Sequence, residues 1–139
     1  MILLDTNVIS EFMKTSPDAR VMAWLNTRAK IDFHLCTPVV AEIRYGIARI
    51  PDGTRKDNLL VACERLEAET FAGRTLAFDR RAAHGYAELR AKRRGIGKPI
   101  SVMDAMIAAI ALAHAMTLAT RNVHDFEGLG VPLVDPFSR

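Results

Sequence analysis

Short apolar runs alternate with helix-forming segments along the whole chain, and this alternation limits the fold more than any other feature of the sequence. The runs are typical of strands buried on both faces, because they are largely continuous and do not alternate with polar residues. We expect strands at residues 1–4, 33–36, 74–78, 117–119 and 131–134. Such strands, separated by helices, predict an α/β fold with a central parallel β-sheet flanked by helices on both faces.

Capping residues and prolines indicate where the helices begin. Ser16 and Thr37 each precede a proline, a residue that favours the first turn of a helix. Asp79 and Ser101 are placed to cap two later helices. We expect helices from Thr6 or Asn7 to Lys14, and over residues 16–28, 39–50, 54–71, 79–94 and 101–114. A loop or turn is expected between the last two strands.

Composition favours one globular domain, residues 1–139. Half of the 139 residues are apolar and a quarter are charged, which excludes a disordered tail or a fibrous repeat. The longest apolar stretch, residues 105–113, is shorter than the about 20 residues that cross a bilayer. The chain opens with no signal-peptide pattern, and Cys36 and Cys63 lack metal-ligand spacing. We therefore expect a cytoplasmic protein with reduced thiols and no membrane contact.

Four acidic residues lie in unusually apolar surroundings or directly after a strand. Asp5 follows the first expected strand, and Glu42 lies early in the helix after the second one. Asp104 is in the first turn of the most apolar helix, and Asp125 follows the strand at 117–119. In a parallel sheet these positions share the edge formed by the C-terminal ends of the strands, where ligands bind.

Carboxylates that meet at one edge repel one another unless a cation lies between them. Oxygen ligands select Mg²⁺ or Mn²⁺, so the sequence predicts a divalent-metal site at this edge. Structural interpretations remain open for each residue. Asp5 and Asp125 can cap a helix or a turn, and Glu42 can be an exposed helix residue. Asp104 follows Ser101 at capping-box spacing, although an acid that caps a helix can also bind a metal.

A cluster of basic residues lies beside the helix that carries Asp104. It consists of Lys92, Arg93, Arg94 and Lys98, in a chain with a net charge of +3. Such a cluster is often only a solvated helix end. Next to a metal site it would hold a phosphodiester backbone by salt-sensitive contacts.

Other chemistries fit the sequence poorly. The segment from Gly95 to Lys98 lacks the spacing of a phosphate-binding loop, and the histidines lack zinc spacing. A phosphatase of the haloacid dehalogenase type would carry a second aspartate two residues after Asp5, where this chain has Asn7. Metal-assisted hydrolysis of a phosphodiester, with Glu42 accepting the proton of the attacking water, is the hypothesis that the residues favour.

Four segments in order resemble the signatures of PIN-domain proteins. They are residues 1–10 (MILLDTNVIS), 41–46 (AEIRYG), 104–109 (DAMIAA) and 120–126 (TRNVHDF). The closest resemblance is to the VapC toxins of type II toxin–antitoxin modules, particularly the FitB-like branch. The likeness covers the entire chain, and four ordered signatures are far more specific than any one of them.

The resemblance implies a role for each matching residue. Asp5, Glu42 and Asp104 match the three firmest acidic positions of the family. Both Asn122 and Asp125 are candidates for the fourth position. Further matches are the pocket residues Thr6, Asn7 and Thr120. Under the hydrolysis hypothesis, the RNA would be positioned by Arg121 and by the cluster Lys92, Arg93, Arg94 and Lys98.

The implied activity is that of a toxin: a Mg²⁺- or Mn²⁺-dependent endoribonuclease, holding one or two cations, with a VapB-like antitoxin as partner. An alternative is the antitoxin-bound half of a DNA-binding regulatory complex with little nuclease activity of its own. The resemblance also implies a homodimer. We expect apolar surface for self-association at Val21, Trp24, Leu25, Ile43 and Ile47, although Trp24 can equally be a core residue.

Overall fold

The structure, a computed structural model, describes residues 1–138 and contains one five-stranded sheet with strand order β3-β2-β1-β4-β5. All neighbouring strands are parallel. The strands are β1 (Ile2–Leu4), β2 (Phe33–Cys36), β3 (Thr75–Leu76), β4 (Thr117–Ala119) and β5 (Leu133–Val134). The predicted α/β class with a parallel sheet is confirmed.

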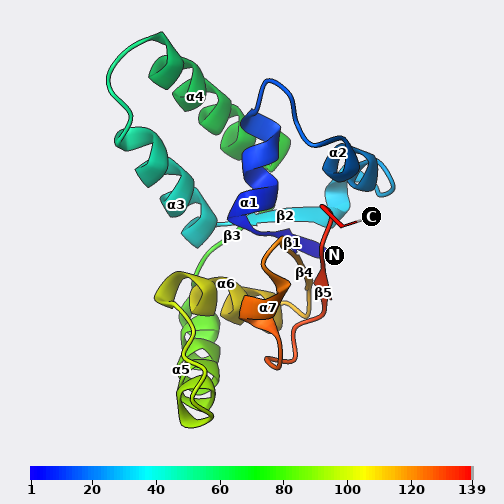
Figure 1. Ribbon diagram of the computed structural model, residues 1–139, viewed down its shortest axis with the longest axis vertical. Helices are drawn as coiled ribbons and strands as arrows, with labels where there is room; N and C mark the ends of the chain where they lie inside the picture. Colours follow the sequence, from blue (N-terminus) through cyan, green and yellow to red (C-terminus); the bar gives the residue numbers. More distant parts are fainter. Residues whose placement is uncertain (139) are drawn as a thin grey trace.

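Helices cover both faces of this sheet (Figure 1). Those on one side, above the sheet in Figure 1, are α1 (Thr6–Ile9), α2 (Ala19–Leu25), α3 (Thr37–Ala48) and α4 (Thr54–Arg65). Those on the other side are α5 (Arg80–Gly95), α6 (Val102–Ala113) and α7 (Val123–Phe126). The shorter segments are the 3₁₀ helices Ser10–Met13 and Lys30–Asp32 and the π-helix Leu66–Thr70.

The start of the second helix and the segment between the last two strands differ from the sequence prediction. The second helix does not begin at Ser16, because the Asp18 side chain accepts hydrogen bonds from Arg20 N and Val21 N and thereby fixes the start of α2. The segment expected as a loop between the last two strands contains the four-residue helix α7. The expected helix over residues 54–71 is α4 continued by the π-helix.

The central strand β1 sets the position of the site. Its three residues are at most 3% exposed, since β2 and β4 pair with it on either side and helices pack on both faces. The chain places β2 and β3 on one side of β1 and then crosses to place β4 and β5 on the other. The C-terminal ends of β1 and β4 therefore form the switch point of the sheet, the place where open α/β sheets bind ligands.

The apolar residues expected at a dimer surface are mostly core residues. Val21, Leu25, Ile43 and Ile47 are all at most 9% exposed, so they offer little apolar surface for a second copy of the chain. Trp24 is half-buried and its ring lies 5.4 Å from that of Phe33. The homodimer stays a prediction that these side chains do not support. Among the helices of residues 1–138, none has the length and apolar character that crossing a bilayer requires.

Candidate active site

Asp5 is the buried centre of the predicted acidic site. It follows β1 directly and is 4% exposed, and its backbone N–H donates a hydrogen bond to Ala119 O at the end of β4 (2.9 Å). The Thr120 hydroxyl donates to Oδ2 (2.7 Å) and Thr6 N donates to Oδ1 (2.8 Å). Burial raises the pKa of Asp5 to about 6, the two hydrogen bonds offset part of this rise, and the charges of Asp104 and Glu42 add to it.

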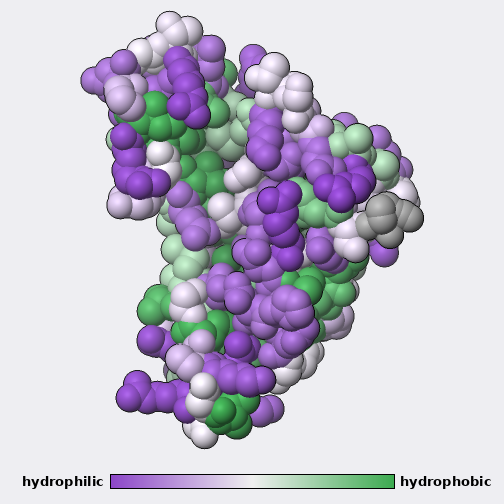
Figure 2. Space-filling model, viewed as in Figure 1, coloured by the Kyte–Doolittle hydropathy of each residue, from purple (hydrophilic) through white to green (hydrophobic). Residues whose placement is uncertain are grey.

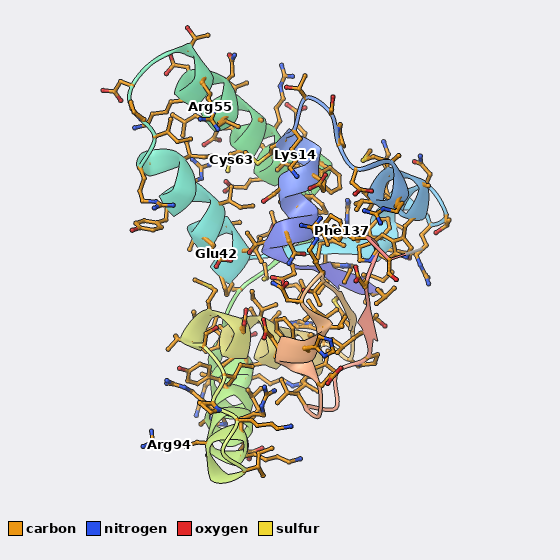
Figure 3. All side chains as sticks on the ribbon, viewed as in Figure 1. Lys14, Glu42, Arg55, Cys63, Arg94 and Phe137 are labelled. Atoms are coloured by element: carbon orange, nitrogen blue, oxygen red, sulfur yellow. The ribbon has the colours of Figure 1, made fainter. Side chains whose placement is uncertain are left out.

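Glu42 reaches the same edge from α3, which begins directly after β2. Its side chain is exposed and accepts a hydrogen bond from the Thr6 hydroxyl. Figure 3 shows Glu42 at the end of α3 that lies beside α1. Thr6 therefore touches two of the predicted acids, Asp5 through its backbone and Glu42 through its side chain.

Asp104 lies in the first turn of α6, whose N-cap is Ser101. The Ser101 hydroxyl accepts from Asp104 N (3.1 Å), as the capping interpretation of this pair predicts. The Asp104 carboxyl group is half-buried, and burial is the main cause of its raised pKa. The charges of Asp125 and Glu42 raise that pKa further, while a hydrogen bond with Ser101 opposes them. Capping and membership of the acidic edge thus coexist in this residue.

The fourth position falls on the segment from Thr120 to α7. Asn122 donates its backbone N–H to the Thr120 hydroxyl (3.0 Å), and its side chain is exposed. Asp125 is also exposed, and its charge is one of those that raise the pKa of Asp104. Of the two candidates, Asp125 is the one with an electrostatic effect on another predicted acid.

A buried hydrogen-bond network holds the ends of β1 and β4 together. Thr120 is fully buried, donates to Asp5 and accepts from Asn122 N. Asn7 Nδ2 lies 3.5 Å from the Thr120 hydroxyl, and Asn7 Oδ1 accepts from Arg121 N (3.1 Å). The predicted pocket residues therefore fix the geometry around Asp5 from both neighbouring loops.

The predicted metal ligands approach one another without forming a complete coordination shell. Charge effects connect Asp5 with Asp104 and Glu42, and Asp104 with Asp125. Within residues 1–138, no three acidic, histidine or cysteine side chains converge closely enough to hold one ion by themselves. The donors are all hard oxygen atoms, and Mg²⁺ commonly takes only one or two protein carboxylates and keeps several waters. The carboxylate oxygens at this edge are therefore suitable ligands for Mg²⁺.

The basic cluster divides into outward and inward residues. Lys92, Arg94 and Lys98 are exposed, as a surface that binds a polyanion requires. Arg93 is buried and donates to backbone carbonyls of Lys98, Asp125 and Glu127. The expectation that Arg93 contacts RNA is not compatible with this geometry, because its donors are directed into the protein.

Arg121 lies at the rim of the site. Its exposed guanidinium stacks on the buried ring of Phe137, with 3.8 Å between the guanidinium carbon and the ring centroid.

A groove of about 810 Å³ extends away from the acidic site between α1, α3 and α4. Glu42 lies at one end and Arg55 at the other (Figure 3), and Thr6 and Asn58 also line the groove. Its apolar lining is Met13, Ile43, Ile47, Ile50, Leu59 and Ala62. Figure 2 shows apolar surface, in green, between α3 and α4 with polar groups around it. Lys14, which lies in the groove lining and pairs with Glu11, was not predicted from the sequence. A lysine three residues after a glutamate is common on helices and does not indicate a groove.

Known proteins of similar sequence and fold match almost the whole chain. "Plasmid stability protein StbB" of Pseudomonas syringae pv. tomato is 45% identical over 137 residues and covers 99% of both chains. "VapC ribonuclease Y4jK" of Sinorhizobium fredii is 41% identical, over 99% of this chain and 98% of that one. A solved structure described as FitAB bound to an IR36 DNA fragment superposes with a TM-score of 0.92 and 41% identity, covering 100% of this chain and 97% of that chain.

The family follows from a match that spans most of the molecule. The family model described as PIN domain matches residues 2–130, which include every strand except β5 and all four predicted acids. This chain belongs to the PIN-domain family.

Proposed function

We propose that this protein is the toxin of a type II toxin–antitoxin module and acts as a Mg²⁺- or Mn²⁺-dependent endoribonuclease. The observation that carries the proposal is the buried Asp5 carboxyl group, with Glu42 and Asp104 close enough to raise its pKa. A relative 41% identical over nearly the whole chain is named a VapC ribonuclease. The full-length likeness to a FitAB complex supports the toxin assignment.

Asp5 and Asp104 would hold the metal, with Glu42 and Asp125 or Asn122 acting directly or through water. A divalent ion bound there supplies two effects: it lowers the pKa of a bound water and neutralises charge on the phosphate. The donors fit, because four carboxylates from four elements repel one another at this edge and prefer a cation among them. The influence of Asp125 on Asp104 favours Asp125 over Asn122 as the fourth residue.

The residues around Asp5 orient the groups that act on the substrate. Thr120 and Thr6 N each bind one carboxylate oxygen of Asp5, so its orientation is fixed before any substrate arrives. Glu42 is exposed at the groove end and is aligned by the Thr6 hydroxyl. It is the carboxylate best placed to accept the proton of the attacking water.

The RNA backbone would lie across the exposed cations beside the site. Lys92, Arg94 and Lys98 follow one another around the end of α5, and the exposed Arg121 directly follows Thr120. Such contacts carry no sequence code and weaken steeply with added salt.

A VapB-like antitoxin would bind in the groove between α1, α3 and α4. The apolar lining with Arg55 among its residues fits a mixed apolar and acidic segment of an antitoxin. The groove ends at Glu42, so a basic antitoxin side chain that reaches this end would mimic the cation and block the site.

A second candidate function follows from the DNA in the related complex. FitAB was solved bound to a DNA fragment, so the chain would also serve as the antitoxin-bound part of a complex that binds operator DNA. Here the antitoxin would supply the DNA-binding element.

Cleavage of an RNA substrate with Mg²⁺, with Mn²⁺ and with EDTA tests the nuclease. We expect cleavage with either metal, none with EDTA, and strong loss in Asp5→Asn and Asp104→Asn. Asp52→Asn is the matched control, because Asp52 is exposed and pairs only with Lys56 within residues 1–138. Undiminished cleavage by both site variants would reject the site.

Expression in cells separates the two functions. Under the nuclease hypothesis the chain alone arrests growth, Asp5→Asn does not, and co-expression of the neighbouring small gene relieves the arrest. Growth without arrest, together with operator binding by the two products, would instead favour the regulatory complex.

A further inference from the structure

Arg93 differs from the basic residues on either side of it. It is 7% exposed, whereas Lys92 and Arg94 are exposed, and Figure 3 shows Arg94 pointing away from α5. Arg93 follows Leu89 by four residues and Ala82 by eleven, and these two residues are also buried. That spacing places all three on the helix face that packs against the protein.

The Arg93 guanidinium bonds backbone carbonyls from two separate segments. Nε donates to Lys98 O in the loop after α5 (2.9 Å). Nη1 donates to Asp125 O and Glu127 O at the end of α7 (3.2 Å each). Within residues 1–138 it forms no ion pair with a carboxylate. Burying a cation without a carboxylate partner costs folding free energy. The guanidinium group of arginine can offset part of this cost, because its several N–H donors can bond more than one carbonyl at once.

The helix that Arg93 holds cannot rely on its own hydrogen bonds. α7 has four residues and no side-chain cap at Asn122. A helix of this length leaves most of its terminal N–H and C=O groups without intrahelical partners. Arg93 supplies a partner for one carbonyl within α7, Asp125 O, and for one directly after it, Glu127 O, and connects both to α5.

Asp125 depends on this support more than the other acids do. Asp5 has a hydrogen bond from Thr120, Glu42 has one from Thr6, and Asp104 is held at the N-cap Ser101. The exposed Asp125 carboxylate has no hydrogen-bond partner among residues 1–138. Its position beside Asp104 is therefore set by the backbone of α7.

We propose that Arg93 is a positioning residue that fixes the backbone of α7 and thereby holds Asp125 beside Asp104, and that it does not contact RNA. Its connection to catalysis rests on the proposed nuclease function. Its effect on α7 does not rest on that function, because the three hydrogen bonds from Arg93 to backbone carbonyls form without metal or RNA.

Hydrogen exchange of the metal-free protein tests the structural part. Arg93→Met removes all three hydrogen bonds, and we expect amide exchange in α7 to become about tenfold faster, while amides of β1 and α3 keep their rates. Arg93→Lys retains one donor group and should give an intermediate rate. Arg90→Met is the control, because Arg90 is an exposed residue one turn earlier that stacks on Tyr86. Unchanged exchange in α7 of Arg93→Met would overturn the proposal.

A double-mutant cycle with Asp125 tests the connection to the site. Arg93→Met should lower kcat/KM by about tenfold in the wild-type background and by less than about twofold in Asp125→Asn, because both changes act through one carboxylate. A general loss of folding would lower both backgrounds equally and would overturn the proposal. If Arg93→Met does not fold, the same cycle is run with Arg93→Lys.

Salt dependence distinguishes positioning from RNA contact. Lys98→Met should reduce the salt slope of RNA binding by about one, as expected for the loss of a phosphate contact, and Arg93→Met should leave the slope unchanged. A reduced slope in Arg93→Met contradicts the inward role. If the wild-type protein cleaves no RNA under any metal condition, the proposed function fails, while the exchange experiment still decides whether Arg93 holds α7.

Discussion

Two buried carboxyl groups in this molecule, Asp5 and Glu11, have opposite electrostatic surroundings. Both are almost inaccessible, with 4% and 2% exposure. Burial alone would raise both pKa values. For Glu11, hydrogen bonds from Lys14 Nζ (2.5 Å) and Asp18 N (2.8 Å), together with the Lys14 charge, outweigh burial, so its pKa lies below the ordinary value. For Asp5, burial prevails and the pKa rises to about 6.

The difference lies in the neighbours. Glu11 has an ammonium group and a backbone N–H, so its charge is compensated within the protein and its role is to connect the 3₁₀ helix to the start of α2. Asp5 has two donors, but the charges near it are the carboxylates of Glu42 and Asp104. A buried acid surrounded by acids is stabilised by a cation from outside. Glu11 is thus a structural carboxylate whose charge is compensated within the protein, whereas Asp5 is a candidate metal ligand.

Replacing each acid by its amide gives the largest expected contrast. Asp5→Asn should lower kcat/KM for RNA by at least about a hundredfold, because it removes the central metal ligand. Glu11→Gln should change kcat/KM by less than about threefold and lower the free energy of unfolding by about 1–2 kcal/mol, through loss of the charge-assisted bonds. Steady-state cleavage and urea unfolding measure the two effects. A catalytic loss in Glu11→Gln as large as that in Asp5→Asn would break the comparison.

The pH dependence of stability without metal should have opposite signs at the two residues. The folded pKa of Asp5, about 6, exceeds the unfolded value of 3.8, so the folded state binds the proton more tightly. Ionising Asp5 therefore destabilises the fold as pH rises from about 4 to above 6, by up to about 3 kcal/mol at 1.36 kcal/mol for each pKa unit. The folded pKa of Glu11 is lowered, so its contribution is present above its ordinary pKa and is lost as pH falls below it.

Urea unfolding in EDTA between pH 4 and 7 measures both contributions. Asp5→Asn should remove the fall in stability toward neutral pH, and Glu11→Gln should reduce the loss at acid pH. Added Mg²⁺ should restore stability to the wild-type protein above pH 6 and should have no effect on Asp5→Asn. A wild-type stability that rises steadily up to pH 7 in EDTA would contradict the surroundings assigned to Asp5.

Most of the fold could be predicted from the chain because its strands and caps are local signals. The bounds of β2 and β4 are as expected, and Asp79 and Ser101 cap α5 and α6. α7 was missed because a four-residue helix held by Arg93 from another element has no periodic pattern of its own. The start of α2 was misplaced because Ser16 and Asp18 are both good caps, and only the bonds made by Asp18 decide between them.

The acidic edge could be predicted from topology, but its details could not. Strand ends in a parallel sheet meet at one edge, so Asp5 and Asp104 could be placed together although 99 residues separate them. The Thr120 hydroxyl bonds Asp5 and the Thr6 hydroxyl bonds Glu42, and the spacing of these residues in the sequence does not predict these pairs. Arg93 was grouped with the surface cations by charge, whereas its spacing from Ala82 and Leu89 already placed it on the buried face.

Removing the Thr120 hydroxyl sharpens the comparison at Asp5. The Thr120 hydrogen bond lowers the pKa of Asp5, so Thr120→Val should raise that pKa further and move the acid limb of the pH–rate profile to higher pH. We expect kcat/KM near neutral pH to fall by about tenfold, since one hydrogen bond to a charged group contributes about 1.5–3 kcal/mol. Thr120→Ser should restore the wild-type profile. A fall in activity without movement of the acid limb would mean that Thr120 acts only on the backbone of Asn122.

The smallest expected effect concerns Arg121, which directly follows Thr120 in the chain. Lys14 forms an ion pair with Glu11, whereas Arg121 forms no ion pair within residues 1–138 and stacks on Phe137. That leaves its charge available for a phosphate. Arg121→Met should weaken binding of RNA to the inactive Asp104→Asn protein by several fold and lower the salt slope by about one. Phe137→Leu should weaken binding by about threefold with the slope unchanged, because it removes only the about 0.5–1 kcal/mol of stacking that orients the guanidinium. An equal loss of slope in Phe137→Leu would mean that the ring itself decides whether Arg121 reaches the phosphate.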